Sequence, residues 1–311
     1  MGLSTAVLRP AILRVAHHPW VRSLVSGTRP GRAVASRFVA GETLAEALAI
    51  AREIHGRGLR TLLDHVGENA ETEEQALAAR EAYLSALAAT GDADDVEAAI
   101  SVKLTHLGLD ASVDACWDNL APIVESAAEK DRLMMIDMES HEYVDETLQL
   151  FQRAHARSPN VGVALQSYLR RSDADVFTLP EGCRVRLVKG AYLEPPELVY
   201  TRKRDVDASY ARLFATLFAH GHRVDIATHD PVLIDGVRRR VDAFVDGWTR
   251  AEFQMLYGVR RDLQSRLASE GYPVRVYIPY GTEWYPYLTR RLAERPANVW
   301  FFVSNLVRAS R

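Results

Sequence analysis

Short apolar segments alternate with longer stretches of helical periodicity along most of the chain. The apolar segments have the length and composition of buried strands and lie at residues 60–65, 98–104, 132–137, 161–165, 184–189, 223–228, 252–256 and 274–278. Amphipathic helices are predicted between and around them, at residues 43–55, 71–89, 114–129, 142–156, 209–220, 231–241, 260–270 and 284–294. Strands that alternate with helices form parallel βα units. Eight such units without a Gly/Ser-rich linker favour an α/β fold with a closed (β/α)8 TIM barrel over a doubly wound sheet.

The composition is that of a globular protein with a sizeable core. The 311 residues are 48% hydrophobic and 25% charged, and the formal net charge of −3 gives no reason to expect nucleic acid as a partner. Cys116 and Cys183 are too few for a disulfide framework. The sequence contains no run of about 18 apolar residues, so we expect no transmembrane helix.

The N-terminal segment differs in charge from the rest. No acidic residue precedes Glu42, whereas arginine recurs six times before it. We expect residues 1–57 to form a helical arm and residues 58–311 to form the catalytic barrel. An Arg-rich, acid-poor mitochondrial transit peptide is the alternative interpretation of the arm.

Ionisable and aromatic side chains follow the predicted strands where a barrel has its active site, at the carboxyl ends. Lys103 follows the second strand, Asp137 the third and Gln166 the fourth. The fifth strand carries Arg186 and Lys189. A buried cation is costly unless it meets an anion. These cations therefore predict either ion pairs, with Asp64, Asp137 or Glu139, or an anionic ligand.

The last predicted helix, 284–294, carries the adjacent pair Arg290 and Arg291. Adjacent residues are about 100° apart around a helix, so the pair can flank a small carboxylate at the edge of a site. The alternative is a solvated pair, with Arg290 bonded to Glu294 at i, i+4.

The missing motifs narrow the reaction class. The sequence contains no GxGxxG or GxxxxGK[ST] phosphate loop. It also contains no HExxH motif of the kind that binds a metal, so we expect no metal. Lys103 or Lys189 can form a Schiff base in an aldolase-type barrel. A barrel that binds an amino acid without catalysis is a third interpretation. Tyr192, Leu256 and Tyr277 favour a wall for a small apolar ring, although they also suit ordinary barrel packing.

Several motifs resemble those of the flavin-dependent proline dehydrogenases, and they occur in order along most of the chain. RLVKGAY (186–192) and YLTRRLAE (287–294) are together highly specific. The others are SVKLTHLG (101–108), DMES (137–140), ATH (227–229), FQMLYG (253–258) and YIPYG (277–281). The resemblance implies a distorted (β/α)8 barrel that holds FAD at its mouth and oxidises L-proline to 1-pyrroline-5-carboxylate by hydride transfer to flavin N5.

The resemblance also implies roles for individual residues. Lys103, Arg290 and Arg291 match positions that bind the substrate carboxylate, and Asp137 matches an acidic site position. Tyr192, Leu256 and Tyr277 match positions that pack on the proline ring. Glu68 resembles a gate residue that pairs with Arg290. Positions around the flavin are matched by Gln166, Arg186, Val188, Lys189, Gly190, Ala191, Thr228, His229 and Glu294.

The partners follow from the same resemblance. Electrons are expected to pass to a quinone acceptor, and a separate pyrroline-5-carboxylate dehydrogenase is expected to use the product. We expect a bacterial cytoplasmic location with peripheral contact at the inner face of the membrane. The mitochondrial matrix is the alternative location.

Overall fold

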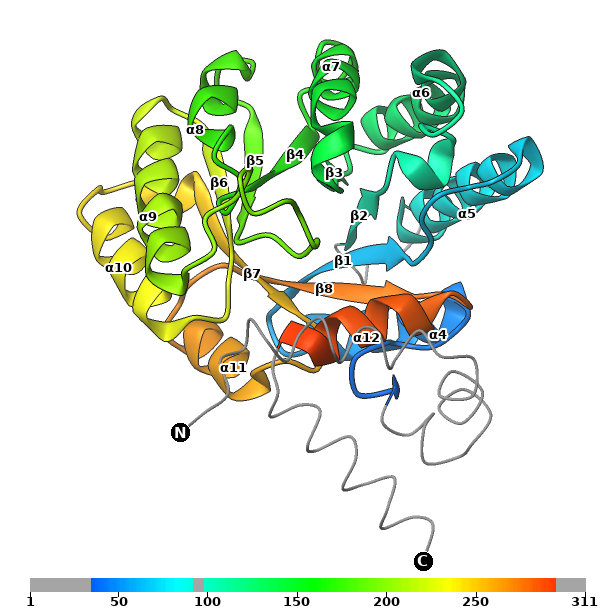
Figure 1. Ribbon diagram of the computed structural model, residues 1–311. Coiled ribbons are helices and arrows are strands. Elements are labelled where there is room, and N and C mark those ends of the chain that lie inside the picture. The colour runs from blue at the N-terminus through cyan, green and yellow to red at the C-terminus, as the bar shows by residue number, and fades with distance from the viewer. Residues whose placement is uncertain (1–34, 92–97, 295–311) are drawn as a thin grey trace, which may run out of the picture.

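The structure is a computed structural model that describes residues 35–91 and 98–294, with side chains described as far as Thr289. Its centre is a closed barrel of eight parallel strands in chain order, in which β8 pairs with β1 (Figure 1). Each predicted strand is present, with ends that shift by no more than two residues, so the predicted barrel is confirmed. The strands are β1 (Arg60–His65), β2 (Ala98–Val102), β3 (Met134–Ile136), β4 (Val161–Gln166), β5 (Arg184–Val188), β6 (Arg223–Ala227), β7 (Ala251–Leu256) and β8 (Val274–Tyr280).

The longer helices agree with the predicted ones, whereas the four-residue helix α8 was not predicted. Only one boundary moves by more than two residues: the helix expected at 209–220 already begins at Lys203. Val206 extends its apolar stripe by one turn before Tyr210 and Leu213, and this turn packs against the core. The helices are α4 (Leu44–His55), α5 (Glu73–Gly91), α6 (Val113–Glu129), α7 (Val144–His155), α8 (Ser172–Asp175), α9 (Lys203–Ala219), α10 (Pro231–Val241), α11 (Arg261–Ser269) and α12 (Trp284–Glu294).

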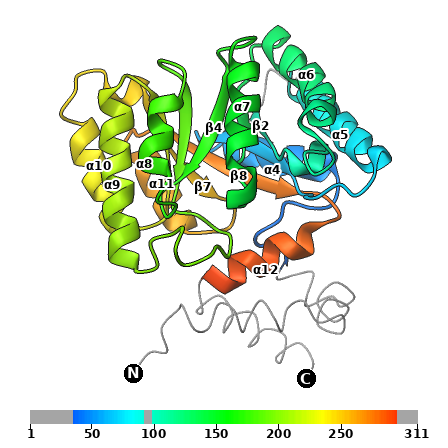
Figure 2. The ribbon, with the colours of Figure 1, turned by 45° about the horizontal axis from the view of Figure 1, so that its top comes forward.

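The last helix, α12, does not close the outer ring. The outer position between β8 and β1 is filled by α4, which packs against both strands. The apolar side of α12 instead packs against Phe38, Val39 and the segment after β1, in a cluster separate from the main core. Figure 2 shows α12 set apart from the ring of helices. This displacement is the distortion that the resemblance implied.

The two sides of the barrel strands bury different kinds of side chain. Successive residues of a strand point to opposite faces. The outward residues are apolar and form the main core with the helices. Leu62, Ala99 and Met135 form a small apolar cluster on the opposite face of β1, β2 and β3. The inward residues of β5 to β8 include polar side chains that are nevertheless buried: Arg186, Asp225, Glu252, Gln254 and Arg275.

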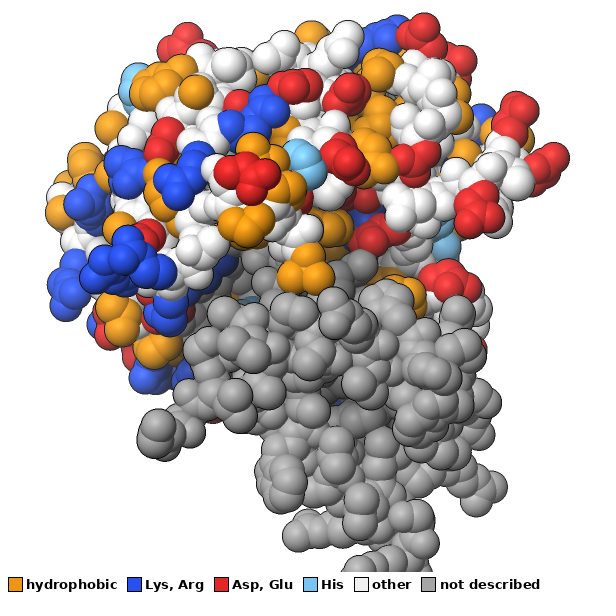
Figure 3. Space-filling model, in the orientation of Figure 1, with side chains coloured by type: hydrophobic (Ala, Val, Ile, Leu, Met, Phe, Trp, Pro, Cys, Tyr) orange, Lys and Arg blue, Asp and Glu red, His pale blue; other side chains and the backbone are white. Residues whose placement is uncertain are grey.

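Charge is unevenly distributed over the surface. Figure 3 shows lysine and arginine side chains gathered on the side of α9 and α10, and acidic side chains on the side of α5 and α6. No helix in the described ranges is both long enough and apolar enough to span a bilayer. Most of the predicted arm, residues 1–34, lies outside the described residues, so the boundary at residue 57 stays a prediction.

Candidate active site

A cavity of about 720 Å³ opens at the carboxyl ends of the strands. It brings together fourteen of the seventeen predicted site residues. The side chains of the other three, Arg290, Arg291 and Glu294, lie outside the described part of the chain. The fourteen are Glu68, Lys103, Asp137, Gln166, Arg186, Val188, Lys189, Gly190, Ala191, Tyr192, Thr228, His229, Leu256 and Tyr277.

Lys103 lies just beyond the end of β2 and is buried. Its Nζ donates to Asp64 Oδ1 at 2.8 Å, to Asp137 Oδ2 at 3.0 Å and to the Tyr277 hydroxyl at 3.3 Å. An ammonium group has three N–H donors, so this arrangement uses all of them. A substrate carboxylate that contacts Lys103 directly must therefore replace one of these partners.

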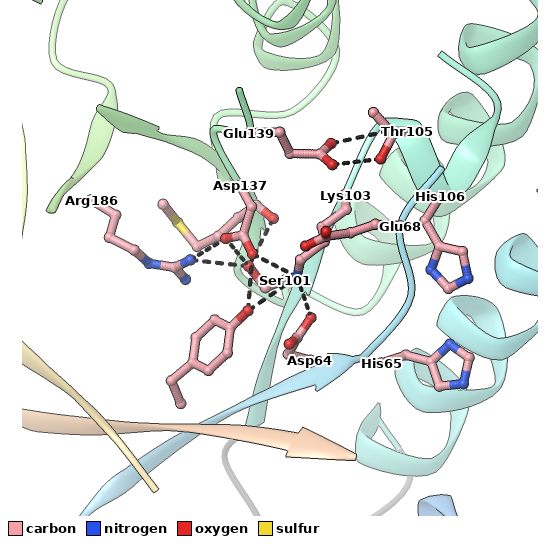
Figure 4. A network of polar contacts seen from close by, with 12 residues as sticks. Asp64, His65, Glu68, Ser101, Lys103, Thr105, His106, Asp137, Glu139 and Arg186 are labelled. Atoms are coloured by element: carbon pink, nitrogen blue, oxygen red, sulfur yellow. Dashed lines mark hydrogen bonds and ion pairs between the residues drawn. The ribbon is translucent and has the colours of Figure 1, made fainter. Parts of the chain in front are cut away.

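Arg186 reaches the same aspartate from the other side (Figure 4). Its Nη1 donates to Asp137 Oδ1 at 2.5 Å and to Ser101 Oγ at 3.0 Å, and its Nε donates to Gln254 Oε1 at 2.7 Å. The guanidinium carbon lies 5.3 Å from the centre of the Tyr277 ring. Nη2 is buried and has no hydrogen-bond partner among the described residues. Buried donors in proteins normally have a partner, so a water molecule or a bound ligand is needed to supply the missing acceptor.

The paired charges keep each other ionised. Burial lowers the pKa of Lys103, but Asp64, Tyr277 and Asp137 outweigh burial and hold this pKa well above its usual value. Burial raises the pKa of Asp137, but Lys103 and Arg186 outweigh it and bring the pKa to about 2. Burial raises the pKa of Tyr277 as well, so its hydroxyl stays protonated and donates to Asp137 Oδ2 at 2.9 Å.

Lys189 lines the cavity but does not join the group around Asp137. Its Nζ donates to Asp207 at 2.6 Å and to Asp230 at 3.0 Å. Lys203 also binds both aspartates. The ion-pair interpretation is thus confirmed for Lys103 and Arg186, whereas the partners named for Lys189 were wrong. Its aspartates lie on α9 and after β6, outside the set that the sequence suggested.

The segment after β5 is held over the cavity by a residue that the sequence analysis did not single out. The Glu194 carboxylate accepts from the backbone N–H of His141 at 2.9 Å and from the Tyr168 hydroxyl at 3.3 Å, and it lies 2.5 Å from His141 Nδ1. Glu194 therefore ties the segment after β5 to the segment after β3. The same segment carries Tyr192, whose hydroxyl donates to Glu68 at 3.3 Å.

Gly190 sets the direction of this segment. Its φ of +118° lies in a region that L side chains rarely adopt, and a Cβ there would lie 2.1 Å from the Tyr168 ring. The chain can therefore turn at this point only if residue 190 has no side chain.

His229 has a structural partner at the cavity wall. The backbone N–H of Leu256 donates to His229 Nε2 at 3.0 Å. A backbone amide is a donor only, so Nε2 carries no proton in this arrangement and the ring proton belongs on Nδ1. His229 thereby orients the start of the segment after β7.

These observations bear on the reaction class. A lysine that forms a Schiff base needs a depressed pKa. The pKa of Lys103 is raised, and Lys189 is paired with two carboxylates, so neither suits an aldolase. Within the described residues, no group of three His, Cys, Asp or Glu side chains is placed to hold a metal ion.

A closed barrel with a charged cavity at the carboxyl ends of its strands defines the class of (β/α)8 enzymes. The sequence model of the proline dehydrogenase family matches residues 47–303. Over 306 residues the chain is 38% identical to the proline dehydrogenase of Deinococcus radiodurans, a match that covers 96% of this chain and 98% of the relative. Proline dehydrogenase 2 of Bacillus subtilis is 35% identical over 271 residues, with 87% and 89% covered. The chain therefore belongs to the proline dehydrogenase family, whose members are oxidoreductases.

Solved structures agree with this assignment. Proline utilization A from Bdellovibrio bacteriovorus, in a form inactivated by N-propargylglycine, superposes with a TM-score of 0.76 at 26% identity. Proline utilization A from Bradyrhizobium japonicum superposes with a TM-score of 0.74, also at 26% identity. The matches cover 84% and 92% of this chain but only 32% and 33% of those longer chains.

Proposed function

We propose that this enzyme uses FAD to oxidise L-proline to 1-pyrroline-5-carboxylate and delivers the electrons to a quinone. Family membership supports proline as the substrate. The structural observation that carries the proposal is Arg186, a buried cation that lines the cavity and keeps one donor, Nη2, without a partner among the described residues. A guanidinium in this position suits a flavin, because positive charge near the ring stabilises the anionic reduced form.

The size of the cavity is compatible with a bound cofactor. Its volume of about 720 Å³ lies within the usual range for cofactor sites, roughly 300–1,000 Å³. When bound, FAD supplies the hydride acceptor. The residues proposed to hold it are Gln166, Arg186, Val188, Lys189, Gly190, Ala191, Thr228, His229 and Glu294.

The substrate is proposed to lie between Lys103 and the wall made by Tyr192, Leu256 and Tyr277. Lys103 supplies positive charge near the carboxylate, and the wall limits how the ring can lie, which is a proximity effect. Tyr287 of α12 lines the cavity, and positions 290 and 291 follow it by about one helical turn. This placement supports Arg290 and Arg291 as the residues that bind the carboxylate.

Glu68 is proposed to close the segment after β1 over bound substrate. It lines the cavity and accepts a hydrogen bond from Tyr192, so it already links the segments after β1 and β5. An ion pair with Arg290 would complete the closure and exclude water from the reacting atoms.

The colour of the purified protein tests the proposal directly. We expect a yellow protein whose flavin absorbance bleaches on anaerobic addition of L-proline and returns on addition of a soluble quinone. A protein that stays colourless after supplementation with FAD contradicts the proposal. Borohydride trapping of a keto substrate on Lys103 or Lys189 would support the aldolase interpretation instead. Cytoplasmic location and peripheral membrane contact stay predictions.

A further inference from the structure

The polar side chains inside the barrel form two tiers of charge. The upper tier surrounds the cavity and contains Lys103, Arg186, Asp64 and Asp137, whose formal charges cancel. The lower tier contains Arg184, Arg275, Asp225 and Glu252, and the partly exposed Arg60 also pairs with Glu252. Arg184 of β5 reaches Glu252 of β7 at 3.3 Å although β6 separates these strands, so the contact crosses the barrel interior.

Gln254 of β7 joins the two tiers. Its amide nitrogen donates to Asp225 Oδ2 at 2.8 Å and to Glu252 Oε1 at 2.9 Å in the lower tier. Its amide oxygen accepts from Arg186 Nε at 2.7 Å in the upper tier. Gln254 is buried and lines the cavity floor together with Arg186.

The two carboxylates determine which way the amide faces. Carboxylates only accept hydrogen bonds, so the NH2 group of Gln254 must point toward Asp225 and Glu252. A flipped amide would place its oxygen against two carboxylates and its NH2 against the Nε–H of Arg186. The lower tier thus directs the amide oxygen at Arg186.

We propose that Gln254 is a positioning residue for the oxidation, which fixes the plane of the Arg186 guanidinium at the flavin site and leaves Nη2 without a partner among the described residues. Asp137 and Ser101 hold Nη1, and Gln254 holds Nε, so three acceptors restrain one planar group. Without Gln254 the guanidinium can rotate about its bond to Asp137. The inference rests on the proposed function, because it requires a flavin beside Arg186.

The experiment compares Gln254→Met with Asn119→Leu. Asn119 of α6 is a buried amide that donates to the backbone oxygens of Leu107 and Ala115 and does not hydrogen-bond to the upper tier, so it controls for the loss of a buried amide. We expect Gln254→Met to retain flavin, to lower kcat about tenfold and to change the KM for proline by less than about threefold. Sulfite, which adds to oxidised flavin when positive charge lies nearby, should bind about tenfold more weakly. Asn119→Leu should leave kcat and sulfite binding unchanged.

A double-mutant cycle separates positioning from a general structural role. In an Arg186→Met background, Gln254→Met should lower kcat by less than about a further twofold, because it acts through Arg186. Independent, multiplicative effects would overturn the inference. So would a Gln254→Met enzyme with normal kcat and normal sulfite affinity.

A second variant covers the case in which Gln254→Met does not fold. Gln254→Asn keeps an amide but shortens the side chain by one methylene, which withdraws the acceptor from Arg186 Nε, so sulfite binding should weaken and kcat should fall, whereas unchanged values contradict the inference. If neither variant folds while Asn119→Leu does, Gln254 is structural and the inference fails. A colourless wild-type protein would defeat the proposed function itself. If the wild-type protein is yellow but the effects of Gln254→Met and Arg186→Met on kcat multiply independently, this inference fails and the proposed function stands.

Discussion

Replacing Asp137 by asparagine removes the carboxylate that Lys103 and Arg186 share. Lys103 and Arg186 lower the pKa of Asp137 to about 2 in the folded protein, so its ionised form stabilises the fold at neutral pH. Removing one partner of a buried ion pair typically costs about 3–5 kcal/mol. Asparagine keeps one acceptor oxygen, so we expect Asp137→Asn to lower the free energy of unfolding by about 2–4 kcal/mol. For a chain of this size this loss lowers the melting temperature by roughly 5–10 °C.

The pH dependence gives the sharper test. A lowered carboxyl pKa contributes stability that is present above pH 4 and is lost as the pH falls through about 2. The difference in melting temperature between wild type and Asp137→Asn should therefore be largest at pH 7 and should shrink by pH 3. The control is Asp145→Asn, which removes an ion pair to Arg171 from an aspartate with a 78% exposed side chain and should cost less than about 1 kcal/mol. Equal melting of wild type and Asp137→Asn at pH 7 would refute the assignment of Asp137 as the shared counter-ion.

Three further substitutions probe other parts of the site. Gly190→Ala should lose flavin and about 1–3 kcal/mol of stability because of its positive φ, and a normal ratio of flavin to protein absorbance would contradict this. Burial raises the pKa of Glu139 to about 7, so the stability from its protonated form is present below pH 4.5 and is lost as the pH rises through about 7. The melting temperature of Glu139→Gln should therefore rise relative to that of wild type between pH 5 and pH 8. A difference in melting temperature that stays constant over this range would contradict a raised pKa for Glu139. Glu194→Ala should raise the KM for proline about tenfold with flavin retained; equal loss of flavin would indicate a folding role.

The strands could be predicted from the sequence because each one is short, apolar and bounded by polar residues. The cavity followed from the rule that barrel sites lie at the carboxyl ends of strands, which placed Lys103, Asp137 and Arg186 together before any contact was known. The alternation of side chains between the two faces of a strand contained a further signal. Glu252 and Gln254 occupy alternate positions of one strand, so they had to share one face of β7.

Other features depend on contacts that sequence spacing does not encode. The apolar periodicity of 284–294 identified a helix but not its packing partner, and α4 rather than α12 occupies the outer position between β8 and β1. Lys189 meets Asp207 and Asp230 because α9 and the segment after β6 approach the end of β5. Such pairings arise only when the barrel closes, so composition and periodicity leave them open.

The charge balance of the cluster around Asp137 predicts that the substrate carboxylate binds cations from outside this cluster. The formal charges of Lys103, Arg186, Asp64 and Asp137 already cancel, and Lys103 has its three donors engaged. Hydride loss from the carbon beside nitrogen requires a neutral amine, so the reactive form of proline carries one net negative charge from its carboxylate. An unbalanced buried charge costs several kcal/mol. We therefore expect the balancing charge to come from another element, and α12, whose Tyr287 lines the cavity, carries two adjacent arginines one turn further along the sequence.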